Sequence, residues 1–166
     1  LLILAASAAF GARSAHAADA AISEAREILK RHPLIDSHND LPMVVRESGN
    51  PPRDVAAYDL DVRTAGDTDI ERLRAGGVGG QFWSVYVPSA PETGTRGFSR
   101  IQLEQIDIAL RIIERYPRDL ALALTAEDIE RANAERRIAS LLGMEGGHAI
   151  DNSLGAVTLT GCDLDC

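Results

Sequence analysis

The chain has 166 residues, of which 45% are hydrophobic and 25% charged. This composition is ordinary for a soluble globular protein and excludes disorder for most of the length. The formal net charge is −8, from 17 basic and 25 acidic residues. Because an acidic surface repels phosphate backbones and no basic cluster interrupts it, we expect no nucleic-acid partner.

The first residues are mostly apolar and lead to small side chains that end in Ala15-His16-Ala17. A short apolar run before an A-x-A sequence is typical of a signal peptide rather than of a membrane-spanning helix. We therefore expect residues 1–17 to be removed on export, to the periplasm or the extracellular space; a buried core helix is the alternative. Export permits disulfides, but Cys162 and Cys166, the only two cysteines, are interpreted as incidental thiols in the C-terminal tail.

The first half of the mature chain predicts two helices and two strands. Residues 22–30 have apolar side chains at helical spacing, and Pro33 ends this helix. Leu34 and Ile35 begin a short buried strand that runs into polar residues, and a polar loop with Gly49, Pro51 and Pro52 follows. Residues 69–75 predict a short helix. Residues 78–87 are rich in aromatic and β-branched side chains and predict a strand that Pro88 stops.

The second half continues the alternation of helices and strands. Ser99 and Gln102 fit a capping box that opens a helix ended by Pro117. Residues 120–124 predict an apolar strand, Thr125 and Asp128 open a helix to about Arg137, and residues 138–144 predict a buried strand. This order indicates an α/β fold with a parallel sheet, either a doubly wound sheet or a (β/α)8 barrel. No Gly-rich phosphate fingerprint follows a strand, which disfavours a nucleotide-binding fold.

Candidate metal ligands follow two of the predicted strands. His38 and Asp40 are two residues apart in an extended segment, so both side chains face the same side. An imidazole and a carboxylate are ligands that zinc accepts. Glu145 follows strand 138–144, and a carboxylate there could bridge two metals for hydrolysis. Taken singly, each has a simpler interpretation: Asp40 as a side chain that caps loop amides, and Glu145 as a turn or helix-cap residue.

Other polar and aromatic residues are weighed in the same way. His148 is a candidate for metal or substrate contact, although a turn that faces solvent is the simpler interpretation. Trp83 is a candidate for substrate contact, but it is interpreted with its aromatic neighbours Phe82 and Tyr86 as core or pocket wall. No nucleophile-elbow sequence is found. Four carboxylates in polar loops are interpreted as solvated: Asp59, Asp61, Asp67 and Asp69.

Several segments, taken together and in order, resemble the membrane (renal) dipeptidase family, peptidase family M19. Residues 35–42 resemble the metal-binding opening of these enzymes, and residues 73–86 resemble their second strand. Residues 103–107 fit the helix that follows, and residues 143–151 resemble the segment that holds their bridging glutamate. Joint occurrence of these segments is far more specific than the His-x-Asp pair alone.

The resemblance implies that residues 18–160 are the N-terminal portion of a (β/α)8 TIM-like barrel of the metal-dependent hydrolase type. It implies two zinc ions, with His38 and Asp40 on one of them and Glu145 bridging both. It also implies that a metal-bound hydroxide attacks the peptide bond of a dipeptide, the small-molecule partner. The expected protein is thus an exported zinc dipeptidase, with membrane association and a homodimer of the full-length form left open.

The chain departs from the family pattern near its end. Gly161 stands where the family has a substrate-contacting histidine, and residues 161–166 match nothing in the family. Further metal-binding histidines, a substrate-binding arginine and the catalytic aspartate belong to later strands of the family. We therefore expect a truncated barrel that does not hydrolyse dipeptides alone. Two alternatives stay open: a non-catalytic remnant or scaffold with one weak metal site, and a different metal-dependent amidohydrolase.

Overall fold

The structure is a computed structural model that describes residues 19–48, 53–89, 97–153 and 155. The chain divides into two units, Leu1–Leu34 and Ile35–Cys166. In the first unit, residues 19–31 are helical, which agrees with the helix predicted there. The predicted signal peptide and the C-terminal cysteines lie outside the described residues. Of the helices that are described, none is both long and apolar enough to cross a membrane.

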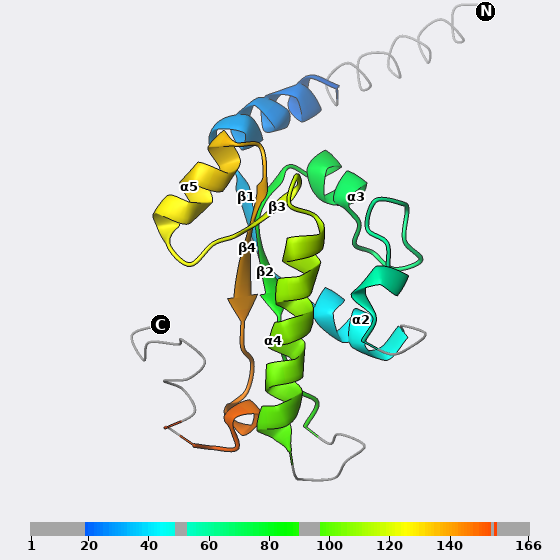
Figure 1. The fold of residues 1–166 in the computed structure, drawn as a ribbon. Helices are drawn as coiled ribbons and strands as arrows, with labels where there is room; N and C mark the ends of the chain where they lie inside the picture. The colour runs from blue at the N-terminus through cyan, green and yellow to red at the C-terminus, as the bar shows by residue number, and fades with distance from the viewer. Residues whose placement is uncertain (1–18, 49–52, 90–96, 154, 156–166) are drawn as a thin grey trace, which may run out of the picture. The chain divides into compact units, whose positions relative to one another are not determined.

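A four-stranded sheet has the spatial order β1-β2-β4-β3 (Figure 1). β2 pairs in parallel with β4, and β4 pairs in parallel with β3. The predicted α/β class with a parallel sheet is thus confirmed. A barrel that followed chain order would place β3 between β2 and β4, whereas here β4 lies beside β2. The four strands are β1 (Leu34–Asn39), β2 (Val78–Ser84), β3 (Leu120–Leu122) and β4 (Ile138–Gly143).

Helices pack on both faces of the central strands. Ile138 of β4 belongs to the main hydrophobic core together with Ile108 and Ile112 of α4. The next residue of β4, Ala139, belongs to a separate small cluster with Ala132 of α5. Because successive strand residues face opposite sides, α4 and α5 cover opposite faces of β4. The helices are α2 (Leu41–Ser48), α3 (Ile70–Ala75), α4 (Phe98–Arg115) and α5 (Ala126–Ala134), with short 3-10 helices η1 (Val55–Ala57) and η2 (Gly147–Ile150).

The predicted polar loop after residue 40 is wrong, because α2 occupies its first part. Leu41, Met43 and Val45 are all buried, so this helix is held by an apolar face rather than by helix propensity. Pro42 lies in the first turn, where proline is tolerated. Arg46 in the last turn forms an ion pair of 2.6 Å with Glu104 of α4.

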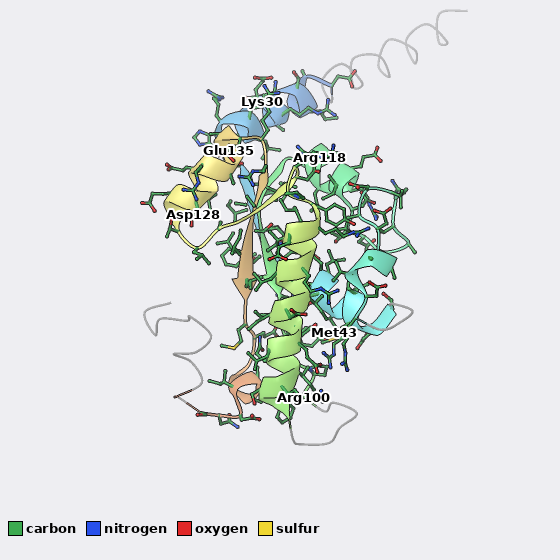
Figure 2. The ribbon with its side chains drawn as sticks, in the orientation of Figure 1. Lys30, Met43, Arg100, Arg118, Asp128 and Glu135 are labelled. Carbon is green, nitrogen blue, oxygen red and sulfur yellow. The ribbon has the colours of Figure 1, made fainter. Side chains whose placement is uncertain are left out.

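The two predicted capping boxes have different outcomes. At α5 the Thr125 side chain accepts a hydrogen bond from the Asp128 amide, and the Asp128 side chain accepts one from the Thr125 amide (Figure 2 labels Asp128). At α4 the prediction is wrong: Gly97, with φ of 82°, is the N-cap and no side chain caps the helix. Ser99 instead donates to Asp151, and Gln102 is buried.

The burial predicted for the first strand is also wrong. Leu34 and Ile35 are 45% and 41% exposed, respectively. The reason is that β1 lies at an edge of the described sheet and has only β2 as a neighbour. The position of β1 beside β2 is nevertheless what brings its carboxyl end to the candidate site.

Candidate metal centre

The three predicted metal ligands lie at the carboxyl ends of β1 and β4, the two neighbours of β2. His38 is in β1, Asp40 directly follows it, and Glu145 follows β4. The distance from His38 Nε2 to Asp40 Oδ1 is 3.1 Å, and that from His38 Nδ1 to Glu145 Oε2 is 4.0 Å. The structure therefore brings together side chains that are more than a hundred residues apart in the sequence.

The imidazole ring of His38 lies between the two carboxylates, with one ring nitrogen directed to each. The side chains of His38, Asp40 and Glu145 are 52%, 50% and 64% exposed, so the cluster is open to water. Among the described residues, no three His, Cys, Asp or Glu side chains converge as metal ligands do. The donor set, one nitrogen and two carboxylates, is of the kind that binds zinc. The assignment of these residues as ligands stays a prediction.

Asn39 separates the two candidate ligands and makes contacts that the sequence analysis missed. Its amide Nδ2 donates to Thr68 Oγ1 at 3.0 Å and to Gln81 Oε1 at 3.4 Å. Its Oδ1 accepts a hydrogen bond of 3.0 Å from the Leu41 amide. The sequence held one signal for this role: the residue between two ligands of an extended segment must face the opposite side.

The charges of the same cluster influence Tyr86. Burial is the main cause that raises the pKa of its phenol, and the negative charges of Asp40, Glu47 and Glu145 raise it further. Its backbone carbonyl accepts a hydrogen bond of 3.1 Å from Gln105 of α4. The phenol therefore stays protonated at neutral pH.

His148 and Trp83 both have structural roles. His148 Nε2 donates to the Val87 carbonyl at 2.7 Å, and its ring meets the Phe98 ring edge-on, with centroids 5.3 Å apart. The ring is half-buried, so the interpretation of a turn residue that faces solvent is wrong. Trp83 is fully buried in the main core, which agrees with its interpretation as core and not with substrate contact.

One of the four carboxylates interpreted as solvated is buried. Asp69 is only 1% exposed and accepts hydrogen bonds from the backbone amide (2.8 Å) and Nε (2.7 Å) of Arg72. The Arg72 backbone amide is the main cause that lowers the pKa of Asp69, and the guanidinium lowers it further. The other three carboxylates, those of Asp59, Asp61 and Asp67, are exposed as predicted.

Comparison with known proteins identifies the family. Residues 22–160 match the family described as membrane dipeptidase, peptidase family M19. Dipeptidase 3 of Rattus norvegicus is 40% identical over 135 residues, which cover 81% of this chain and 26% of the relative. Dipeptidase ataJ of Aspergillus terreus is 39% identical over 141 residues, which cover 81% of this chain and 34% of the relative. The chain thus spans about a quarter to a third of these relatives.

Solved structures of the family share the fold. Dipeptidase AC, a metallopeptidase of family M19, has a TM-score of 0.60 at 27% identity, over 78% of this chain and 39% of that one. A Rhodobacter sphaeroides metallopeptidase, solved with a phosphinate mimic of L-Ala-D-Ala, has a TM-score of 0.61 at 22% identity, over 78% and 42%. The described elements are thus part of the TIM-barrel-like α/β fold of these enzymes. The chain belongs to the membrane dipeptidase family of metallopeptidases, peptidase family M19.

Proposed function

We propose that this chain carries part of the active site of an exported dipeptidase that uses two zinc ions. The observation that supports this most directly is the meeting of His38, Asp40 and Glu145 at the carboxyl ends of two strands, within 3.1 and 4.0 Å. Sites of barrel enzymes gather at this end of the strands. Export is proposed from the apolar N-terminal sequence that ends in Ala15-His16-Ala17.

In this proposal His38 and Asp40 hold one zinc and Glu145 bridges both. Gly146, with φ of 83°, turns the backbone directly after the bridging carboxylate, a conformation that glycine adopts without strain. Bound zinc supplies Lewis-acid polarisation of the scissile carbonyl. The His38 ring hydrogen-bonds Asp40, and the two side chains would give up that bond if both held zinc. Three side chains are too few for two metals, so the remaining ligands come from outside the described residues.

The proposed substrates are dipeptides with either L or D residues at the carboxyl-terminal position. The relatives named as dipeptidases support dipeptides as the substrates. The L-Ala-D-Ala mimic bound by the Rhodobacter sphaeroides protein supports a D residue at the carboxyl-terminal position.

The test is hydrolysis of L-Ala-L-Ala and L-Ala-D-Ala by the full-length protein with zinc. Glu145→Gln keeps the shape of the side chain but removes the bridging charge. We expect kcat/KM to fall by more than about 100-fold, beyond the loss typical of residues that only support metal ligands. Glu135→Gln is the matched control, because Glu135 is half-exposed and pairs only with Arg137 among the described residues. Equal activity of Glu145→Gln and Glu135→Gln would refute the proposal. Residues 18–166 alone are expected to show no turnover.

A further inference from the structure

We propose that Asn39, Thr68 and Gln81, which we call the Asn39 clamp, are positioning residues that orient His38 and Asp40 for metal binding. The inference rests on the metal site proposed above and assigns it a support that lies in a different part of the chain. Thr68 is 29 residues from Asn39 in the sequence and Gln81 is 42 residues away.

The clamp fixes the strand end from the face opposite the ligands. Asn39 alternates with His38 and Asp40, so its side chain points away from theirs. All of its polar atoms are used: Nδ2 bonds Thr68 and Gln81, and Oδ1 bonds the Leu41 amide at the start of α2. Rotation of the strand end about its axis would break these bonds. The direction in which the two ligands project is thereby set.

Gln81 holds β1 at two points, one on either side of His38. It is fully buried in β2, and its Oε1 accepts the bond from Asn39. Its Nε2 donates to the carbonyl of Asp36 at 3.4 Å. A fully buried glutamine is costly unless its amide is hydrogen-bonded, so replacing it by an apolar residue of like size leaves Asn39 and Asp36 without these partners.

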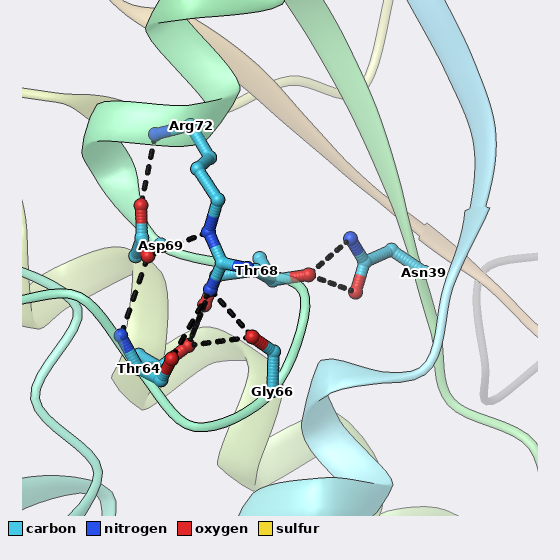
Figure 3. Close-up of polar contacts among 6 residues, drawn as sticks. All are labelled: Asn39, Thr64, Gly66, Thr68, Asp69 and Arg72. Carbon is cyan, nitrogen blue, oxygen red and sulfur yellow. Dashed lines mark hydrogen bonds and ion pairs between the residues drawn. The ribbon is translucent and has the colours of Figure 1, made fainter.

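Thr68 is held in turn through Thr64 by the ion pair of Arg72 and Asp69, as Figure 3 shows. The Thr64 hydroxyl donates to the Thr68 carbonyl at 2.8 Å. Arg72 Nη2 donates to that hydroxyl at 2.8 Å and to the Gly66 carbonyl at 2.5 Å, while Nε pairs with the buried carboxylate of Asp69 at 2.7 Å. One guanidinium therefore closes the loop that presents Thr68 to Asn39.

This arrangement matters for the metal because the hydrogen bonds of the clamp use none of the side-chain atoms of His38 or Asp40. Ligands whose backbone is already fixed lose less conformational freedom on binding than ligands on a free loop. Partners that hold metal ligands in place typically contribute 10- to 100-fold in metal affinity. Since the clamp acts through the backbone and touches neither ligand side chain, we expect a loss at the low end of that range.

The experiment measures the zinc affinity of the full-length protein by competition with a chelator, together with the midpoint of thermal unfolding. Thr68→Val removes the hydroxyl at nearly constant volume, whereas Thr68→Ser keeps the hydroxyl and removes the methyl group. Thr125→Val is the matched control, because Thr125 is a hydrogen-bonded threonine that caps α5. Gln81→Met is a second variant on another strand, which decides the matter if Thr68→Val does not fold. His38→Ala tests the site itself.

We expect Thr68→Val and Gln81→Met each to weaken zinc binding about tenfold, Thr68→Ser to bind like the unaltered protein, and Thr125→Val to lower the unfolding midpoint without changing zinc affinity. The inference is overturned if Thr68→Val, or Gln81→Met in its place, binds zinc as tightly as the unaltered protein while His38→Ala does not. If His38→Ala also leaves zinc affinity unchanged, the proposed metal site fails, and the inference fails with it.

Discussion

Tyr116→Phe removes one oxygen atom that bonds three residues and connects two segments of the chain, residues 59–60 and 115–116. The Tyr116 hydroxyl accepts hydrogen bonds from the Leu60 amide at 2.8 Å and from Arg115 Nε at 3.2 Å, and it donates to Asp59 at 3.3 Å. Tyr116 and Leu60 are both buried, whereas Arg115 and Asp59 are exposed. The exposed partners can bond water after the change, but the Leu60 amide cannot.

The expected cost is therefore that of one buried amide left without a partner, about 2 kcal/mol within a usual range of about 1–3 kcal/mol. With a urea dependence of about 2 kcal/mol per molar, the midpoint of urea unfolding falls by about 1 M. Zinc affinity should stay unchanged, because the hydroxyl bonds none of the three proposed ligands.

Tyr58→Phe is the control for this prediction. It removes the same atom from a half-buried tyrosine that lies two residues before Leu60, and no buried amide among the described residues depends on that hydroxyl. Urea unfolding followed by circular dichroism measures both variants against the unaltered protein. Equal midpoints for Tyr116→Phe and Tyr58→Phe would refute the reasoning, since the Leu60 amide would then have no need of its partner.

Two further changes test the core and the buried charge. Ile108→Ala, at a fully buried position of α4, should lower the free energy of unfolding by about 2–5 kcal/mol, whereas Leu103→Ala, 60% exposed on the same helix, should change it by less than about 0.5 kcal/mol. Asp69→Asn should be less stable than the unaltered protein at pH 7. Because folding lowers the pKa of Asp69, its contribution is complete above the ordinary value of 3.8 and is lost as the pH falls through the lower folded value. The difference between the two proteins in thermal melts should therefore shrink below about pH 4, and a difference independent of pH would contradict this assignment.

The sequence predicted the local features that depend on short-range pattern. The apolar run before Glu145 predicted β4, and the Thr125 and Asp128 pair predicted the cap of α5, because both signals lie within a few residues. The same rule failed at α4, where Ser99 bonds Asp151, 52 residues away, and tertiary packing buries Gln102. A local pattern cannot report such a distant competitor.

The candidate site shows the same division. His38, Asp40 and Glu145 could be selected because each follows a predicted strand and belongs to a segment that resembles the family. The contacts of Thr68 and Gln81 with Asn39 could not be predicted, since these residues hydrogen-bond Asn39 only after the chain has folded. The burial of Asp69 was missed for a related reason: a carboxylate in a polar segment looks solvated until its loop closes over Arg72.

The central claim is that Asp40, together with His38 and Glu145, binds zinc. The most direct measurement is calorimetric titration of the metal-free full-length protein with zinc. It compares the unaltered protein with the variants Asp40→Asn and Asp107→Asn. Asp107 is an exposed carboxylate of α4 that pairs with Arg111 at 3.6 Å, so it controls for the loss of one negative charge. We predict that Asp40→Asn loses at least about tenfold in zinc affinity. The ligands that zinc prefers are thiolates, neutral imidazoles and carboxylates, and a neutral amide is a poor ligand. Asp107→Asn should bind like the unaltered protein. Equal zinc affinity for all three proteins would contradict the account.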